Sequence, residues 1–156
     1  MQIQHLVSHL STDQTMTVDG FFHHRGGNNN LYRRDYMRVL AFEDTYDIGV
    51  LLESQGIDLT KIQFQQYWNS NDALEHISNF EPDVLLLDHY MPPYTGLEVL
   101  KDLNAAISSA DIVRPQLIVA MSSDERKNEQ MMKFGADVTT SKFEVAFLSI
   151  FRDYSS

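Results

Sequence analysis

The chain has 156 residues, 43% of them hydrophobic, which suits one domain of ordinary size with a real core. It contains no cysteine, which excludes a disulfide scaffold, thiol chemistry and a metal site built from thiolates. The formal net charge is −10, and residues 1–35 hold three basic and three acidic residues, so the whole excess of negative charge lies in the rest of the chain. A negatively charged surface repels nucleic-acid phosphates, and we therefore expect no direct DNA binding.

Residues 1–35 show no sustained hydrophobic period. The stretch FFHHRGGNNN (residues 21–30) is typical of loops, and only residues 3–10 favour a short helix, so we predict a flexible N-terminal arm. The N-terminus lacks a basic start with a long apolar run behind it, and no segment approaches about 18 consecutive apolar residues. The sequence therefore indicates neither a signal peptide nor a membrane span, and a cytoplasmic location is expected.

From residue 36 onward, strand-like runs alternate with helix-like segments. In chain order, the sequence predicts strand 36–42, helix 45–55, strand 62–68, helix 71–80, strand 84–87, helix 96–107, strand 117–121, helix 124–134, strand 136–141 and helix 143–151. The runs VLAF, VLLL and LIVAM are apolar throughout, as strands buried on both faces are, whereas IQFQQYW alternates like an edge strand. Strict alternation predicts an α/β fold, a doubly wound five-stranded parallel sheet with helices on both faces.

Three acidic residues directly follow strands of this predicted sheet. In the doubly wound strand order 2-1-3-4-5, the first and third strands are neighbours, and ligands bind beyond their carboxyl ends. Glu43 and Asp44 follow the first strand, and Asp88 follows the third. Three like charges in one crevice repel one another, and a hard divalent cation such as Mg²⁺ relieves that repulsion. The sequence therefore predicts a Mg²⁺ site at this edge of the sheet.

Four segments, each at the end of a predicted strand, share a pattern with one known family. They are VLAFED (residues 39–44), VLLLDHYMPPYTGLEVL (84–100), AMSS (120–123) and GADVTTSK (135–142). Together they resemble the response-regulator receiver domain of two-component signalling, over residues 36–151. One such segment is a weak signal, but four in the right order are a strong one. The resemblance implies a flavodoxin-like fold and a receiver domain over residues 36–156.

The resemblance also implies roles for individual residues. Asp88 would be the phosphoryl acceptor, a carboxylate nucleophile that forms an acyl phosphate. Glu43 and Asp44 would hold Mg²⁺ together with Asp88 and the backbone carbonyl of Tyr90, with Asp44 the more direct ligand of the first two. Lys142 would place a fixed positive charge beside the phosphoryl group.

Receiver domains also carry a serine or threonine at the end of the fourth strand, whose hydroxyl binds a phosphoryl oxygen. Counting back from Gly135 with the usual family spacing gives Ala120, which has no hydroxyl. The run IVAMSS instead fits the family pattern with Ser122 in this role, if the segment after it is shorter than usual. We favour Ser122, and Ala120 stays as the alternative.

The sequence departs from the family at two positions near the lysine. Proline commonly follows the lysine through a cis bond, but Phe143 follows Lys142, and a cis bond outside X–Pro costs roughly 2.5–4 kcal/mol, so we expect a trans bond. An aromatic residue often lies three positions before the lysine and moves inward on activation, but Thr139 is found there. Both departures bear on the relay of the signal more than on the acceptor.

We therefore predict a stand-alone response regulator, since the chain ends at Ser156, just after the last predicted helix. It would take its phosphoryl group from a histidine kinase or phosphotransfer protein and catalyse only its own phosphorylation and dephosphorylation. Output would be docking of a protein target on the face formed by helix 124–134, strand 136–141 and helix 143–151. The resemblance also leaves room for a homodimer.

Two other functions compete with this prediction. A receiver-like interaction module that never cycles phosphate is favoured by the two departures and disfavoured by the retained acids and lysine. A phosphohydrolase with an aspartyl nucleophile commonly carries a second aspartate two residues after the first, and Tyr90 stands at that position.

Overall fold

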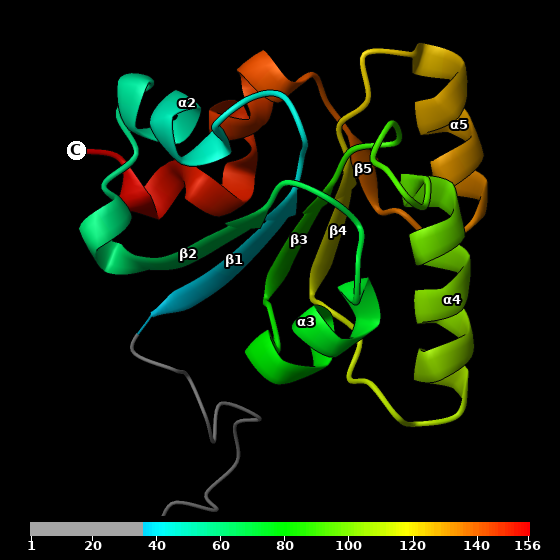
Figure 1. Cartoon of the computed structure of the whole chain (residues 1–156). Helices are drawn as coiled ribbons and strands as arrows, with labels where there is room; N and C mark the ends of the chain where they lie inside the picture. The colour runs from blue at the N-terminus through cyan, green and yellow to red at the C-terminus, as the bar shows by residue number, and fades with distance from the viewer. Residues whose placement is uncertain (1–35) are drawn as a thin grey trace, which may run out of the picture. The chain divides into compact units, whose positions relative to one another are not determined.

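The computed structural model of the chain describes residues 36–156, and the predicted arm of residues 1–35 lies outside this part. The described residues form one sheet in the order β2-β1-β3-β4-β5, in which every neighbouring pair is parallel (Figure 1). The strands are β1 (Met37–Phe42), β2 (Ile62–Tyr67), β3 (Val84–Leu87), β4 (Leu117–Ala120) and β5 (Val138–Thr139). This is the flavodoxin-like, doubly wound sheet that the sequence predicts, and the predicted fold class is confirmed.

Helices cover both faces of the sheet (Figure 1). The α-helices are α2 (Ile48–Ser54), α3 (Ala73–Phe80), α4 (Gly96–Ser108) and α5 (Glu125–Lys133), and the 3₁₀-helices are η2 (Leu59–Lys61), η3 (Lys142–Phe147) and η4 (Ser149–Tyr154). One face packs against α2, η3 and η4, and the other packs against α3, α4 and α5. None of the helices in residues 36–156 is both long enough and apolar enough to cross a bilayer.

The central strands supply both layers of the core. Along β1, Val39 and Ala41 join the apolar cluster under α2, while Leu40 and Phe42 join the cluster under α3 and α4. All four side chains are fully buried. Alternate residues of one strand therefore face two hydrophobic layers, which explains why these strands are apolar throughout. Burial of each large apolar side chain stabilises the fold by about 1.5–3 kcal/mol.

The predicted helix 143–151 is wrong as an α-helix, because two 3₁₀-helices occupy this segment. They are separated at Leu148, which has extended backbone angles (φ −60°, ψ 139°). Val145 and Phe151 are buried and Leu148 packs beside them in the same cluster. These residues are spaced three apart, which matches the three residues per turn of a 3₁₀-helix and not the 3.6 of an α-helix. The predicted strand 136–141 is likewise shorter, since β5 covers only Val138–Thr139.

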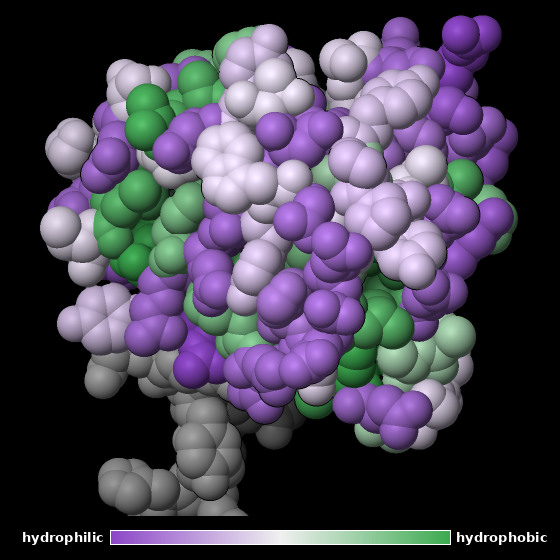
Figure 2. Space-filling view, viewed as in Figure 1, coloured by the Kyte–Doolittle hydropathy of each residue, from purple (hydrophilic) through white to green (hydrophobic). Residues whose placement is uncertain are grey.

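The surface in the same view is mostly hydrophilic, with hydrophobic residues exposed in small separate areas (Figure 2). The most exposed large apolar side chains of the described residues are Val113 and Phe147, at 83% and 75%. Phe147 lies on η3, which also carries the lysine of the predicted site at its first residue.

Candidate functional site

The structure brings together the three acidic residues that the sequence places at strand ends. One carboxylate oxygen from each of Glu43, Asp44 and Asp88 lies within 4.8 Å of the others. Glu43 and Asp88 are buried, with 0% and 2% of their surface exposed, whereas Asp44 is exposed. The cluster therefore has an enclosed floor and one open side.

Backbone hydrogen bonds beyond the strands fix where these acids lie. The Asp88 N–H donates to the carbonyl of Phe42 (3.0 Å), and the Glu43 N–H donates to the carbonyl of Tyr67 (3.1 Å). The parallel pairing thus continues for one residue past the ends of β1 and β3. Because Asp88 is bonded to the residue just before Glu43, the two carboxylates are held at neighbouring points of the sheet edge.

The loop after Asp88 is held close to the strand end by the start of α4. The carbonyl of His89 accepts hydrogen bonds from the N–H groups of Met91 (3.1 Å) and Gly96 (2.8 Å). A Cβ atom at Gly96 would lie only 2.0 Å from the backbone oxygen of Asp88. Glycine is therefore required for α4 to begin against the backbone of Asp88. A capping box between Thr95 and Glu98 fixes the same helix start.

The side chain of Glu43 is occupied on both oxygens. Oε1 accepts hydrogen bonds from the N–H groups of Thr45 and Tyr46, both at 3.0 Å. Oε2 forms an ion pair with Lys142 Nζ at 2.6 Å. Neither Glu43 Oε2 nor Asp88 Oδ1 accepts a hydrogen bond from the described residues, but of these two buried oxygens only Asp88 Oδ1 also lacks an ion pair. Of the two buried carboxylates, Asp88 is the one with an oxygen left for a ligand.

Lys142 reaches both buried carboxylates from the first residue of η3. Its Nζ lies 2.6 Å from Glu43 Oε2 and 3.3 Å from Asp88 Oδ2, and only 11% of its side chain is exposed. The one cis peptide bond in residues 36–156 joins Pro92 and Pro93, so the bond between Lys142 and Phe143 is trans, as expected. Phenylalanine in place of proline therefore leaves Lys142 at the site.

The charges of the cluster shift two pKa values. Burial raises the pKa of the Asp88 carboxyl; the nearby charge of Lys142 opposes this shift and that of Glu43 adds to it, with a net rise. Burial alone lowers the pKa of Lys142, but its contact with Glu43 and the charge of Asp88 outweigh burial and raise that pKa. Lys142 thus stays positive, while Asp88 in the metal-free cluster is harder to ionise than an ordinary aspartate.

The residues fit a hard divalent cation. Three carboxylates meet one ammonium group, so the cluster has an excess of negative charge, and Asp88 Oδ1 is buried without a partner. Oxygen ligands on an open-sided acidic cluster suit Mg²⁺, which keeps several of its waters. The sequence also predicts the backbone carbonyl of Tyr90 as a ligand, and this stays a prediction.

The two candidates for the hydroxyl position lie in different environments. Ala120 is the last residue of β4, pairs with Leu87 and is buried in the core. Ser122 lies two residues further, in the loop before α5, and is also buried. The Met121 N–H donates to the Leu87 carbonyl (3.1 Å), so this loop starts beside the residue that precedes Asp88. This environment favours Ser122, whose role at the site stays a prediction.

Two side-chain contacts near the site were not predicted from the sequence. Asn128 of α5 is buried and hydrogen-bonds both the N–H (2.9 Å) and the carbonyl (2.8 Å) of Ser122. The Tyr90 hydroxyl donates to Asp124 Oδ2 at 3.1 Å, which links the loop after β3 to the N-cap residue of α5. A signal for Asn128 does exist in the sequence, since it lies three residues before Met131 and so on the same inward face of the helix.

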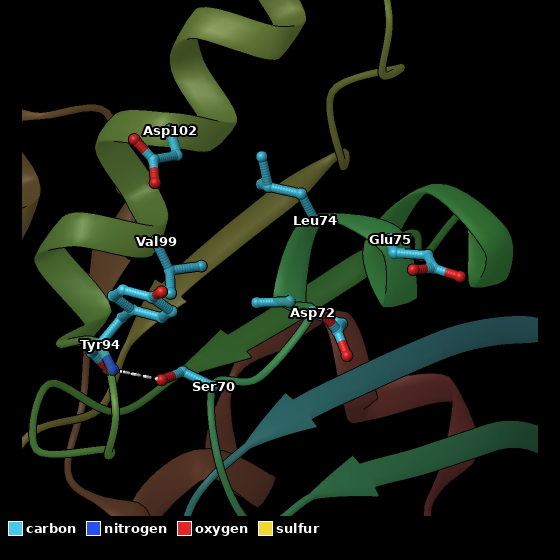
Figure 3. Close-up of a pocket in the computed structure, with 8 residues that line it drawn as sticks. Ser70, Asp72, Leu74, Glu75, Tyr94, Val99 and Asp102 are labelled. Carbon is cyan, nitrogen blue, oxygen red and sulfur yellow. Dashed lines mark hydrogen bonds between the residues drawn. The ribbon is translucent and has the colours of Figure 1, made fainter.

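The cavity between α3 and α4 lies apart from this cluster. It has a volume of about 370 Å³, and Asp72, Glu75, Asp102 and Tyr94 are among the residues that line it (Figure 3). Ser70 closes one side through a hydrogen bond from the Tyr94 N–H to its hydroxyl (2.7 Å). None of the predicted site residues lines this cavity.

Comparison with known proteins agrees with this geometry. Residues 39–145 match the family model of the response regulator receiver domain. Among solved structures, the chain resembles the response regulator signal receiver domain from Bermanella marisrubri at 28% identity and a TM-score of 0.57, covering 76% of this chain and 98% of that one. No curated protein matches the chain.

A second solved structure is more distant and bears on the fold alone. It is the receiver domain of the histidine kinase CKI1 from Arabidopsis thaliana complexed with Mg²⁺ and BeF₃⁻, at 18% identity and a TM-score of 0.58, covering 76% of this chain and 89% of that one. The family match spans more than half of the chain and includes the ends of β1 and β3, where the acidic cluster lies. This chain belongs to the response-regulator receiver-domain family.

Proposed function

We propose that this chain accepts a phosphoryl group on Asp88 and reports its presence by protein docking. One observation supports this role above the others. Asp88 Oδ1 is buried at a strand end without a hydrogen-bond partner among residues 36–156, while Oδ2 of the same carboxylate lies 3.3 Å from Lys142 Nζ. The carboxylate of Asp88 can thus act as the nucleophile while Lys142 places a fixed positive charge beside it.

The phosphoryl group comes from a phosphohistidine of a histidine kinase or phosphotransfer protein. A carboxylate oxygen of Asp88 attacks the phosphorus, so that an O–P bond forms and the P–N bond of the donor breaks. The donor imidazole keeps the electron pair of that bond, and the product on Asp88 is an acyl phosphate. Lys142 lies beside the same carboxylate and neutralises part of the charge that the phosphoryl oxygens add.

The acidic side chains serve to hold Mg²⁺ and to keep Lys142 in place. Asp44, Asp88 and the carbonyl of Tyr90 are the ligands that we assign, with Glu43 close behind them. When bound, Mg²⁺ supplies positive charge for the oxygens of the group in transfer. Glu43 already receives two backbone N–H groups and Lys142, so its first task is to orient the lysine toward Asp88.

Output occurs on the face formed by α5, β5 and the two 3₁₀-helices. This face exposes Met132 (41%) on α5 and Phe147 (75%) on η3. Phe134, at the end of α5, lies instead against Lys101 of α4. Exposed apolar side chains among polar ones suit a docking surface for a protein partner. The C-terminal part of this face consists of two 3₁₀-helices and not of the α-helix that the sequence predicted there.

A module that binds partners without cycling phosphate is the second candidate. The contact of Lys142 with Glu43 favours it, because an ion pair at 2.6 Å partly satisfies the site in the absence of a cation. Thr139 also favours this second candidate, because threonine has no aromatic ring that could move into the core on activation.

Labelling with acetyl phosphate in Mg²⁺ tests the two candidates. We expect the wild-type chain to incorporate phosphate, Asp88→Asn to incorporate none, and the exposed Asp102→Asn on α4 to behave as wild type. Incorporation by Asp88→Asn would show that another residue is the acceptor. Absence of label in the wild-type chain, with and without Mg²⁺, would favour the module that does not cycle phosphate.

A further inference from the structure

Ser122 is attached to α5 and not to the sheet. Its N–H donates to Asn128 Oδ1 (2.9 Å), and its carbonyl accepts from Asn128 Nδ2 (2.8 Å). Its hydroxyl oxygen accepts from the N–H of Asp124, the N-cap residue of α5, at 3.2 Å. Three of its polar groups are therefore bonded to a single helix.

The sheet does not hold Ser122 in this way. The pairing of β4 with β5 covers Val119 and Ala120, and the last bond is from the Thr140 N–H to the Ala120 carbonyl (3.0 Å). On the other side, the pairing with β3 ends at the bond from Met121 to Leu87. Beyond Met121, the side-chain amide of Asn128 forms the backbone hydrogen bonds that a neighbouring strand would otherwise form.

Asn128 is one of the two buried residues by which α5 is attached to the domain. Only two residues of α5 are buried, Met131 in the core and Asn128 at 8% exposure. A buried amide is stable only if its polar groups are paired, and here both of its pairs are with Ser122. A displacement of Ser122 therefore moves the point at which α5 is anchored, or breaks two buried hydrogen bonds.

We propose that Asn128 is a positioning residue that holds the Ser122 hydroxyl for the phosphoryl group and makes α5 follow Ser122 when that group arrives. The inference rests on the function proposed above. The Ser122 oxygen accepts from Asp124, which leaves its proton to donate to a phosphoryl oxygen on Asp88. The movement of Ser122 toward this acceptor is passed through Asn128 to α5 and its exposed Met132.

This route does not need an aromatic side chain in β5. The residue three positions before Lys142 is Thr139, which is exposed and too small to fill a space in the core. The link from Ser122 to the docking face runs instead through one side chain of α5 and two hydrogen bonds. It also explains why a polar residue occupies a buried position of this helix.

The test follows the backbone amides of α5 by NMR while Mg²⁺ and beryllofluoride are added as a mimic of the phosphoryl group. The proteins are the wild-type chain, Asn128→Ala, Asn128→Asp and the control Gln130→Ala, which changes an exposed residue of the same helix. Asn128→Asp keeps the shape and the acceptor of the side chain but cannot donate to the Ser122 carbonyl when ionised.

We expect the α5 amides and the Asn128 side-chain amide to shift in the wild-type chain, and the α5 amides to shift equally in Gln130→Ala. In both Asn128 variants, beryllofluoride should bind about tenfold more weakly, as expected for the loss of a buried hydrogen bond. At saturation, the α5 shifts should fall to about a third or less of the wild-type size, while resonances next to Asp88 still respond.

Four results would overturn the inference. Full α5 shifts in both Asn128 variants would show that the signal takes another route, and a Gln130→Ala variant as defective as Asn128→Ala would point to general weakening of the helix. The wild-type chain alone provides a further test, because an Asn128 side-chain amide resonance that does not shift would contradict the inference. If beryllofluoride does not bind the wild-type chain at all, the proposed function fails, and the inference fails with it.

Discussion

Lys142 Nζ lies 2.6 Å from Glu43 Oε2, in an ion pair of which Glu43 is fully buried and the lysine side chain is only 11% exposed. The same nitrogen lies 3.3 Å from Asp88 Oδ2, so one cation is shared between two carboxylates. Charges taken out of water are tolerated only when they are paired, and removal of one partner leaves the other uncompensated. Lys142 therefore contributes to the stability of the resting domain as well as to the chemistry of the acceptor.

Replacement of Lys142 by methionine should destabilise the fold. The variant leaves Glu43 and Asp88 buried without their shared cation, and we expect the free energy of unfolding in metal-free buffer to fall by about 3 kcal/mol. Urea denaturation measures this change. The control is Lys61→Met, because Lys61 pairs with Asp58 at 3.2 Å but its side chain is 54% exposed, so the cost should stay under about 1 kcal/mol. Equal losses in the two variants would contradict the role assigned to Lys142.

Mg²⁺ should stabilise the wild-type domain through the acidic cluster. A ligand that binds only the folded state adds about 2.7 kcal/mol at a concentration 100 times its dissociation constant. Asp88→Asn removes one carboxylate with a free oxygen, so its gain at the same Mg²⁺ concentration should be clearly smaller. The exposed Asp102→Asn serves as the matched loss of one charge. A thermal-shift titration that gives the same gain in all three proteins would place the cation elsewhere.

Most of the site residues that directly follow a strand could be predicted from the sequence. Runs such as VLLL are apolar because two layers cover them, and this pattern predicts both the central strands and the point at which Asp88 leaves the sheet. Parallel strands end at one edge, so Glu43, Asp44 and Asp88 could be placed together from topology. Lys142 was placed by the resemblance, since nothing in its local pattern distinguishes it from a surface lysine.

Contacts that depend on loop geometry were not predictable in the same way. The bonds between Asn128 and Ser122 join a side chain to the backbone of an irregular loop, whose course no hydrophobic period describes. At the C-terminus, the spacing of three between Val145, Leu148 and Phe151 was present in the sequence, but an α-helical period fits a short apolar segment almost as well. The burial of Val145 and Phe151 in the core favours two 3₁₀-helices over one α-helix in this segment.

Alanine in place of Gly96 should disturb Asp88 directly. The added Cβ would lie 2.0 Å from the Asp88 carbonyl oxygen and 2.9 Å from its carbon, and backbone cannot move aside by a rotation of a side chain. We expect a loss of about 1–3 kcal/mol in stability, as for other overpacked sites, and a slower phosphorylation by acetyl phosphate. Gly49→Ala is the control, because its nearest contact is the ring of Phe64 at 3.1 Å, a side chain able to shift. Unchanged phosphorylation of Gly96→Ala would mean that α4 can shift without moving the acceptor.

The raised pKa of Asp88 gives the metal-free domain a specific dependence on pH. Aspartate in the unfolded chain titrates near its ordinary value of 3.8, whereas burial and the charge of Glu43 raise the pKa in the folded state despite the opposing charge of Lys142. Between these two pKa values the folded state binds more protons than the unfolded state. The contribution of Asp88 to the free energy of unfolding therefore falls as the pH rises through this window, and it is constant above the folded pKa.

Comparison of the wild-type chain with Asp88→Asn isolates this contribution from the other acids. In buffer with EDTA, the stability of the wild-type chain relative to Asp88→Asn should decrease as the pH is raised above 3.8 and then level off, and urea denaturation at a series of pH values measures it. Saturating Mg²⁺ should remove the decrease, because the cation favours the ionised carboxylate. A difference that increases with pH in EDTA would mean that Lys142 outweighs burial at Asp88, and that its carboxylate is already ionised and stabilised before any cation binds.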